Sequence, residues 1–326
     1  MPFLRALLTL PLPFLTCVRR FCYDYVTNLA ILSTIRTEML SLNVKKQYIS
    51  DLVDWIEANL TDDLNIDLIT LKSGYSKWHM QRMFKEMTGQ TLAAYTRKRR
   101  LTMSAMALRL TRMPLIDIAV RFGFDNQQNF TRVFKSHFSL TPGAFRRVPD
   151  LQLQSFHGPI SVYGEMLQAQ LVERDELQLR GELIEWECKF GDYVRDHAQT
   201  VAQQARQFVQ LAAPHVERGW LGFQYGPGSS AAEQQHISLF QALESQHADI
   251  LGSQIVNWTS ARGLYATFPW QGAPEQLTRF IADLYYVHLP ALGVARRQGK
   301  DLLRLDMKAS TPDALVGLFS IPVAQS

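Results

Sequence analysis

Two stretches of this chain read alike. Residues 74–85 are GYSKWHMQRMFK, and residues 123–135 are GFDNQQNFTRVFK, with one residue inserted in the second stretch. The correspondence continues downstream, where Thr91 and Tyr95 match Thr141 and Phe145. The sequence therefore carries a duplicated unit, and the elements around each copy decide the fold of its N-terminal half.

The first copy lies within a run of predicted helices. Apolar residues recur at helical spacing in this region, beginning with Ile49, Leu52, Val53, Ile56 and Leu60. Gly74 suits a left-handed C-cap, and the side chains of Ser76 and Thr91 suit N-caps. These signals predict helices at about 46–60, 66–73, 77–88 and 92–112.

The second copy follows the same order after Pro114, which interrupts the long helix. Asp125 is expected to cap its second helix, and Thr141 with Pro142 begins a short last helix. The predicted helices here are 115–121, 126–137 and one that begins at 142. The two copies are thus two helix-turn-helix units, about 66–88 and 115–138, joined by a long helix. The corresponding aromatic residues, Tyr75 with Phe124 and Phe84 with Phe134, are expected in the core.

Beyond about residue 155 the pattern changes to strands alternating with helices. Ile184, Trp186, Cys188 and Phe190 alternate with Glu185, Glu187 and Lys189, which predicts a half-buried strand. A helix with one apolar stripe follows, through Val194, Ala198, Val201, Ala205, Phe208 and Ala212. Strands at 220–225 and 237–243 come next, and the order then recurs as a strand at 263–270, a helix through Leu277, Phe280, Ile281 and Leu284, and a strand at 316–323. Two strand–helix–strand–strand copies predict an α+β domain with its helices on one face of the sheet.

The charges are divided unevenly along the chain. The net charge is +4, yet residues 39–150 hold 17 basic and 10 acidic side chains, whereas residues 151–326 hold 13 basic and 18 acidic ones. The basic excess is concentrated within 77–147, where 14 basic residues face 3 acidic ones. A basic domain joined to an acidic one is typical of a nucleic-acid-binding domain coupled to a domain with another role. A solvated charged face would give the same pattern.

The cysteines and the N-terminal residues indicate the cellular compartment in which the protein is expected. Cys17, Cys22 and Cys188 are too few and too scattered for a disulfide framework or a zinc site, so we expect a reducing, cytoplasmic compartment. Residues 1–16 read like a short signal peptide, but two prolines interrupt the apolar run, which is too short to span a bilayer. We favour translation from Met39, with 1–38 as upstream sequence. A disordered or helical extension and a targeting segment are the alternatives.

A helix-turn-helix places its second helix in the major groove, where the first turns of that helix meet base edges. A helix over 92–112 would be roughly 30 Å long, close to the ~34 Å between successive major grooves on one face of B-DNA. One monomer could then read an asymmetric site over two turns. The residues expected to contact DNA are Trp78, His79, Gln81, Arg82 and Lys85 in the first copy, and Gln127, Gln128, Thr131, Arg132 and Lys135 in the second.

These residue types suit different contacts. Arg82 can pair bidentately with guanine, and Gln81 can reach adenine. Trp78 lies off the apolar stripe of its helix, which suggests contact with thymine methyls or sugars, whereas His79 would contact phosphate or solvent. The run 97–100 is expected to be a solvated or phosphate-neutralising face. Surface ion pairing is the alternative role for Arg82 and Arg132.

The repeated motif resembles the AraC/XylS family of transcription regulators. The matching residues are Gly123-Phe124, Phe130 to Lys135, Thr141 to Arg146 and, in the first copy, Gly74 to Lys85. The Trp-His-x-Gln-Arg pattern at 78–82 is similar to the subgroup of Rob, MarA and SoxS. The resemblance covers about 45–148 and implies activation of stress and antibiotic-resistance promoters, at a degenerate asymmetric site, by recruiting RNA polymerase. Thr70 and Phe145 depart mildly from the family, where a small residue and a tyrosine are usual.

Residues 155–326 are similar to the GyrI-like effector-binding fold, which makes the domain order Rob-like. The similarity rests on the element order and on segments such as 220–223, 263–268 and 318–323. In that fold a groove between the two repeats commonly binds amphipathic cations through aromatic residues and a carboxylate. The residues implied for such a ligand are Glu185, Trp186, Glu187, Trp258, Tyr265 and Trp270. Glu244 is a further available carboxylate, and Asp306 only loosely matches the acidic residue that is usual near the last strands.

Three roles are open for the C-terminal domain: effector binding, partner binding or sequestration without a ligand, and hydrolysis of a small molecule. His236, His247 and His288 are isolated in the sequence, and no Ser/His/Asp or Cys/His pattern is visible, so we do not expect an enzyme. No cofactor or metal is expected. The expected partners are double-stranded DNA, RNA polymerase and a small amphipathic effector, but no membrane, with the protein at the nucleoid in the cytoplasm.

Overall fold

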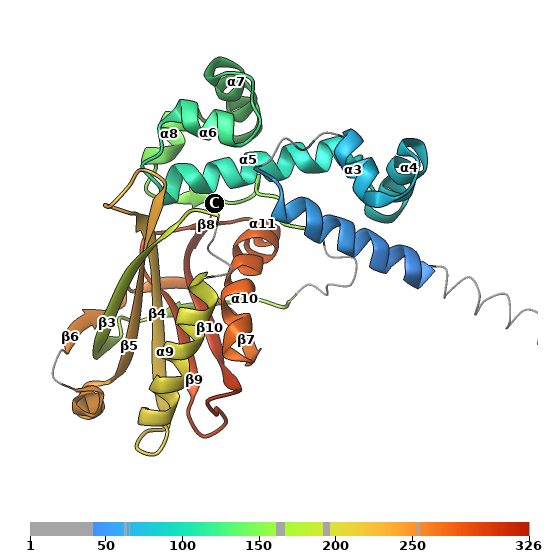
Figure 1. The fold of residues 1–326 in the computed structure, drawn as a ribbon. Coiled ribbons are helices and arrows are strands. Elements are labelled where there is room, and N and C mark those ends of the chain that lie inside the picture. Colours follow the sequence, from blue (N-terminus) through green and yellow to red (C-terminus); the bar gives the residue numbers. More distant parts are fainter. Residues whose placement is uncertain are drawn as a thin grey trace, which may run out of the picture.

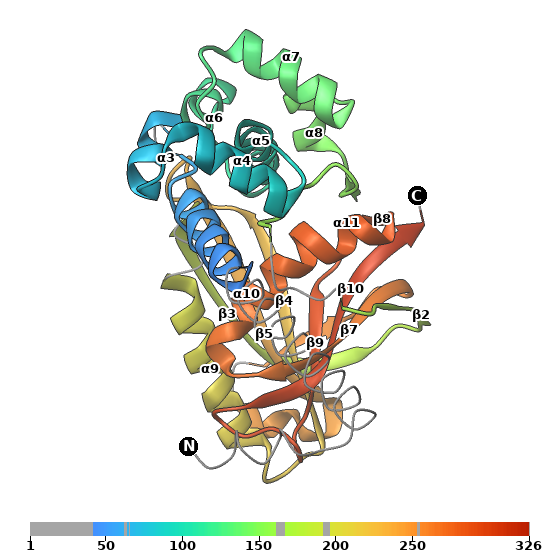
Figure 2. The same ribbon diagram turned by 90° about the vertical axis from the view of Figure 1, so that its right-hand side faces the viewer.

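The computed structural model describes residues 42–61, 64, 66–160, 167–191, 196–252 and 255–325. A helical domain rests on one end of a sheet domain, and the long helix α5 (Leu92–Leu110) lies along their boundary (Figures 1 and 2). The expectations for residues 1–38, including translation from Met39, lie outside the described residues.

The ends of the helices in the N-terminal half are set by local signals. Ser76, Thr91 and Thr141 each accept a hydrogen bond on the side-chain oxygen from a backbone N–H three residues further on. Gly74, at φ 69°, ends the first short helix in the left-handed conformation. The helices are one over 42–58, α3 (Ile66–Ser73), α4 (Lys77–Thr88), α5, α6 (Leu115–Arg121), α7 (Gln127–Phe138) and α8 (Pro142–Arg147).

The start of α7 differs from the expectation that Asp125 caps it. Asn126 is the cap, because its Oδ1 accepts a hydrogen bond from the Asn129 N–H at 2.8 Å. Asp125 instead accepts a longer bond of 3.4 Å from the Asn129 side chain. Two adjacent short acceptors cannot be ranked from sequence, and the residue inserted in the second copy moves the cap by one position.

We call α3 with α4 the first unit and α6 with α7 the second unit, and their apolar residues belong to different clusters. The first unit is held around Ile49, Val53, Ile56, Met80, Met83, Phe84 and Tyr95. The second unit belongs to a larger cluster that continues from Phe130, Phe134 and Phe145 into the sheet domain, where it includes Phe208, Phe223, Phe268 and Phe319. The partly buried Met103 packs against both clusters. The second unit therefore shares its core with the sheet domain, whereas the first unit has its own.

The sheet domain is antiparallel in every strand pair of the described residues. Its strands are β1 (Leu151–Gln152), β2 (Gln170–Arg174), β3 (Gln178–Lys189), β4 (Arg218–Pro227), β5 (Gln234–Glu244), β6 (Val256–Thr259), β7 (Gly263–Gly272), β8 (Val294–Arg296), β9 (Asp301–Asp306) and β10 (Leu315–Gln325). The pairing order is β2-β7-β10-β9-β4-β5-β3-β6, and β8 pairs with the end of β10 and with β1.

The two halves of the sheet have the same strand order. Strands β3, β4 and β5 surround the helix α9 (Asp196–Ala212) in sequence, and β7, β9 and β10 surround α10 (Leu277–Asp283). The pairing of β4 with β9 joins the halves at the centre of the sheet. Both helices lie on the same face of the sheet (Figures 1 and 2), and α10 continues into the π-helical turn η4 (Leu284–His288) and α11 (Leu289–Leu292).

Candidate nucleic-acid interface and effector domain

Helix α4 has one apolar face and one polar face. Met80, Met83 and Phe84 are buried in the core of the first unit. The residues expected to meet DNA are all exposed: Trp78, His79, Gln81, Arg82 and Lys85. Trp78 is 66 % exposed, and a large apolar ring left in water favours a partner that covers it. This face of α4 therefore combines a large exposed ring with exposed polar and basic side chains.

Arg82 is held on this face by weak contacts. Its Nε donates to Glu86 Oε1 at 2.7 Å, and its guanidinium carbon lies 5.2 Å from the centroid of the Trp78 ring. The hydrogen bond from Arg82 lowers the pKa of Glu86. Exposed ion pairs one helical turn apart contribute little to stability, so Arg82 can leave Glu86 at small cost.

Tyr75 was expected in the core, but 44 % of its surface is exposed. Its ring packs edge-on against Tyr48 and also against His79, each at 5.0 Å between centroids. Its counterpart Phe124 is half-buried against Phe130. The two positions differ because the first unit closes on a small core of its own, whereas the second continues into the core of the sheet domain.

Helix α7 presents the corresponding face of the second unit. Phe130, Phe134 and Phe138 are buried, and the exposed residues include Gln127, Gln128, Arg132 and Lys135, with Thr131 half-buried beside them. Arg132 Nη2 donates to Asn129 Oδ1 at 3.2 Å, a contact within the same helix. Arg82 and Arg132 are each the sixth residue of their helix, so the two units carry an exposed arginine at the same position.

Helix α5 sets the spacing of these two faces. It contains 19 residues, two fewer than expected, because Thr111 leaves the helix at φ −136° before Pro114. At ~1.5 Å per residue α5 is roughly 28 Å long. The helix α4 lies beyond its N-terminal end, and α6 to α8 lie beside its C-terminal half on the side away from the sheet (Figure 1).

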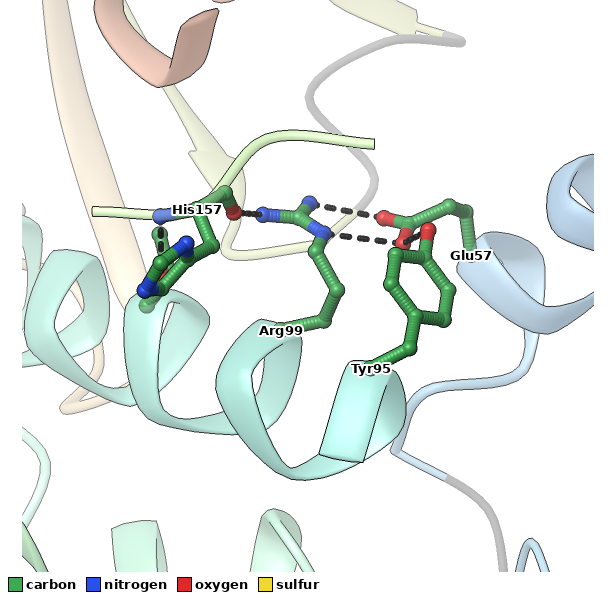
Figure 3. Close-up of polar contacts among 5 residues, drawn as sticks. Glu57, Tyr95, Arg99 and His157 are labelled. Carbon is green, nitrogen blue, oxygen red and sulfur yellow. Dashed lines mark hydrogen bonds and ion pairs between the residues drawn. The ribbon is translucent and has the colours of Figure 1, made fainter. Parts of the chain in front are cut away.

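The basic run of α5 is not the single solvated face that was expected. Arg97 is exposed, but Lys98 and Arg100 are half-buried, and Arg99 is only 2 % exposed. Arg99 donates through Nη2 and Nε to the two carboxylate oxygens of Glu57, at 2.7 and 2.8 Å, and through Nη1 to the carbonyl of His157 (Figure 3). Arg99 therefore ties the helix over 42–58 to α5 and to the segment that follows α8.

The same group of residues reaches the sheet domain. Tyr95 Oη donates to Glu57 Oε1 at 2.5 Å, and the Tyr286 ring of η4 lies 5.2 Å from the guanidinium carbon of Arg99. Burial alone would lower the pKa of Arg99, but the hydrogen bonds and the charge of Glu57 raise it, so the Arg99 guanidinium stays charged despite its burial. We call Glu57, Tyr95, Arg99, His157 and Tyr286 the Arg99 cluster. Sequence reasoning missed it, since nothing in the sequence marks one of the four basic residues at 97–100 as buried.

The second unit and the segment just before it make direct hydrogen bonds to the sheet domain. Arg121 Nη2 donates to the Phe190 carbonyl at 2.5 Å, and the Arg112 N–H donates to the Ala232 carbonyl at 3.0 Å. Arg121 also lies 3.7 Å from a carboxylate oxygen of Glu233. Phe190 itself belongs to the apolar cluster that the two domains share.

The residues expected to bind an effector are divided between the two faces of the sheet. On the helix-covered face, Trp186 packs against His197 of α9 and Trp270 against Phe280 of α10, at 5.2 and 4.4 Å between centroids. Strand alternation places Glu185, Glu187, Trp258 and Tyr265 on the opposite face. The Trp258 ring there is covered by Lys300, whose Nζ lies 5.5 Å from its centroid. The structure does not bring these six residues together around one cavity.

The carboxylates that were considered for effector binding already have hydrogen-bond or ion-pair partners. Glu187 accepts hydrogen bonds from the backbone and hydroxyls of Ser229 and Ser230, which hold its pKa at about 2. Glu244 lies 3.6 Å from Arg218, and Asp306 accepts from the backbone N–H groups of the turn that follows it.

Glu185, His236 and Ser238 meet on the opposite face, although His236 looked isolated in the sequence. The bonds between them are 3.0 to 3.2 Å, and the same ring nitrogen of His236 faces both Glu185 and Ser238. A catalytic triad needs a histidine that uses one ring nitrogen for the nucleophile and the other for the acid. This arrangement is therefore not a triad.

Comparison with known proteins agrees with this geometry. A family model described as a helix-turn-helix domain matches residues 69–148. The chain is 34 % identical over 262 residues to the right origin-binding protein of Escherichia coli (strain K12), which covers 78 % of this chain and 89 % of that protein. The chain is a Rob-like member of the AraC family.

Other similar proteins belong to the same group. The transcriptional regulator Rob of Salmonella typhimurium is 33 % identical over 259 residues, which covers 78 % of this chain and 89 % of that protein. The regulatory protein SoxS of Escherichia coli (strain K12) is 48 % identical over 101 residues, 31 % of this chain and 94 % of that protein. Membership makes the Rob-like chain a DNA-binding transcription regulator, as its repeated motif indicated. Among the described residues of this regulator, no helix combines the length and apolarity that crossing a bilayer requires.

Proposed function

We propose that this regulator binds an asymmetric DNA site as a monomer, with α4 and α7 in successive segments of the major groove. The observation that carries the proposal is the matched position of Arg82 and Arg132 on two exposed helix faces, at opposite ends of a helix roughly 28 Å long. Successive major grooves on one face of B-DNA are ~34 Å apart. Two helices held at opposite ends of α5 can therefore enter two successive grooves.

The individual contacts follow from residue chemistry. Arg82 and Arg132 present forked donors that match the O6 and N7 acceptors of guanine, and Gln81, Gln127 and Gln128 match adenine. Trp78 supplies apolar contact with thymine methyls or sugars, while His79, Lys85, Thr131 and Lys135 lie where phosphates or base edges border the groove. The basic excess over residues 77–147 adds affinity that does not depend on sequence.

The regulatory part of the proposal rests on the family. The regulator activates transcription of stress and antibiotic-resistance promoters by recruiting RNA polymerase, and its sheet domain binds a small amphipathic effector. A sheet domain that only contacts or sequesters another protein is the competing role. Thermal shift of the full chain against bile salts, fatty acids, bipyridyls and cationic dyes separates the two, because a uniformly negative panel contradicts effector binding.

The DNA-reading proposal is tested by fluorescence anisotropy on a selected duplex and on a random duplex. Arg82→Ala and Arg132→Ala should each cost about 1–3 kcal/mol on the selected duplex and much less on the random one. Arg262→Ala is the matched control, since Arg262 is exposed on the sheet domain and, within the part of the chain that the structure describes, pairs with Asp175 alone, at 3.5 Å. Equal losses on the two duplexes would contradict base reading by either arginine.

A further inference from the structure

A small cavity of about 330 Å³ lies where α5, the segment over 154–160 and the sheet domain meet. Gln90, in the turn between α4 and α5, lines it together with Tyr95 and Lys98 of α5. From the sheet domain, η4 and α11 contribute residues of the stretch 286–291. Ligand sites typically have volumes of ~300–1,000 Å³, so this cavity is of the size that holds a small organic molecule with one ring.

The wall of the cavity is mainly apolar. Besides the rings of Tyr95 and Tyr286, its apolar residues are Phe156, Pro159, Ile160, Val287, Pro290 and Ala291. The Tyr95 hydroxyl is already engaged by Glu57, so this residue offers mainly the carbon of its ring. An apolar wall with a few polar groups is typical of sites for organic molecules. A fully hydrated inorganic ion would gain little from it.

The charge in this wall is positive. Among the described residues that line the cavity, Lys98 is the charged one, and none is an aspartate or a glutamate. Lys98 is half-buried, and within the described part of the chain no hydrogen bond or ion pair engages its ammonium group. Its charge lowers the pKa of both His157 and the adjacent His137. The neighbouring Arg99 is already neutralised by Glu57, so the charge left for a ligand to balance is that of Lys98.

Two further side chains have hydrogen-bonding capacity to spare. The Gln90 side-chain oxygen is buried without a hydrogen-bond partner among the described residues, and rotation of the amide can present either its oxygen or its NH₂ group. The His157 backbone is fixed, since its carbonyl accepts from Arg99 (Figure 3) and its N–H donates to Thr102 at 3.0 Å. The His157 ring is half-exposed and, in the described ranges, makes no hydrogen bond. A ligand that supplies the missing partners would recover the cost of leaving such groups unsatisfied.

We propose that this cavity binds a small aromatic carboxylate, with its charge at Lys98 and its ring against the apolar wall. The Gln90 amide and the His157 ring are placed to donate to the same ligand. The site is separate from any effector site within the sheet domain, because the helical domain supplies its charged residue. It also differs in charge from a site for organic cations, since Lys98 would repel them.

The position of the cavity connects it to the first unit. Gln90 directly follows α4, and Tyr95, His157 and Tyr286 belong to the Arg99 cluster. A carboxylate at Lys98 would add contacts between the helical domain and α11 across the boundary that the Arg99 cluster already spans. Occupation of the cavity should therefore slow hydrogen exchange in the turn after α4 and in α11 together.

The test is a ligand-observed NMR titration of the full chain with benzoate, with neutral benzamide of nearly the same shape, and with inorganic phosphate, which has no apolar body. Wild type should bind benzoate at least tenfold more tightly than either of the others. Lys98→Met should weaken benzoate binding at least tenfold, whereas Arg97→Met, at the exposed neighbouring position, should leave it unchanged. Equal affinity for benzoate and benzamide, or unchanged benzoate binding in Lys98→Met, overturns the proposal. Phosphate binding as tight as that of benzoate overturns the aromatic ligand class.

A second variant tests the location. Ala291 is exposed at the rim of the cavity on α11, so Ala291→Trp can fill the cavity without disturbing the core. Ala291→Trp should weaken benzoate binding at least tenfold, with thermal unfolding used to verify that the chain is folded. Benzoate binding of wild-type strength by folded Ala291→Trp overturns the assignment to this cavity.

Discussion

The first and second units have similar sequences but are attached to the rest of the molecule in different ways. The second unit is joined to the sheet domain by a continuous apolar core, in which Phe134 and Phe145 belong to the same cluster as Phe223 and Phe319. The first unit has a separate core around Phe84, and the polar Arg99 cluster joins it to the sheet domain. The two units are therefore similar in sequence but contact the sheet domain through different kinds of interaction.

This difference indicates which unit can respond to a ligand. Close-packed apolar cores resist displacement, because any shift opens voids. An ion pair at a domain boundary depends instead on the charges around it, which a ligand can change. We expect the second unit to hold a fixed position on the sheet domain and the first unit to carry the response.

The largest effects should come from the two cores. Phe84→Ala and Phe134→Ala remove fully buried rings, and each should lower the free energy of unfolding by about 3–5 kcal/mol. Hydrogen exchange should show loss of protection confined to the first unit in Phe84→Ala, but extending into α9 and β4 in Phe134→Ala. The same pattern of exchange in both variants would contradict the separation of the two cores.

The next effect should come from the ion pair of the Arg99 cluster. Arg99→Met leaves Glu57 partly buried without its partner and should cost about 3 kcal/mol in chemical denaturation. Glu57→Leu combined with Arg99→Met should recover most of this loss. Arg97→Met, at an exposed position of the same helix, serves as the control. If Arg99→Met lowers the free energy of unfolding no more than Arg97→Met does, the Arg99 cluster does not stabilise the first unit.

A smaller effect concerns pH. Burial, together with the charges of Lys98, His137 and Arg99, lowers the pKa of His157 to about 4, from an ordinary value of 6.5. The folded state binds fewer protons than the unfolded state between these values, so this contribution to stability is complete above pH 6.5 and is lost as the pH falls towards 4. Because His157 is half-exposed, we expect a loss of about 1 kcal/mol after allowance for solvent screening.

The pH effect is measured by denaturant unfolding between pH 7 and pH 4. His157→Gln should flatten this part of the profile, whereas His215→Gln, at an exposed position, should not. If the pH profile of the unfolding free energy is the same in His157→Gln as in wild type, protonation of His157 does not contribute to it.

The smallest effect concerns the exposed part of the basic run. Arg97→Ala should weaken binding to selected and random duplexes alike, and should lower the slope of log affinity against log salt by about 1. Salt titrations by anisotropy measure this slope. A loss on the selected duplex alone would instead assign Arg97 to base reading.

Sequence alone predicted most of the local structure. The caps at Ser76, Thr91 and Thr141 involve neighbours within three residues, so short-range chemistry determines them. The alternation in 184–190 correctly placed Trp186 on a buried face, and the same alternation separates Trp186 from Glu185 and Glu187. Strand β9 went unpredicted.

The interdomain features were beyond the reach of sequence reasoning. The burial of Arg99 depends on Glu57, 42 residues away, and on Tyr286 in the other domain. Contacts of this kind leave no periodicity or spacing in the sequence, and for that reason the basic run was interpreted as a uniform surface.

In vitro selection of duplex sites by wild type, Arg82→Ala and Arg132→Ala tests the central claim most directly. The account predicts an asymmetric wild-type site with two preferred blocks about one helical turn apart. Each variant should then lose preference in one block only, and the two variants in different blocks. A symmetric site bound by two chains, or loss of preference in the same block for both variants, would contradict it.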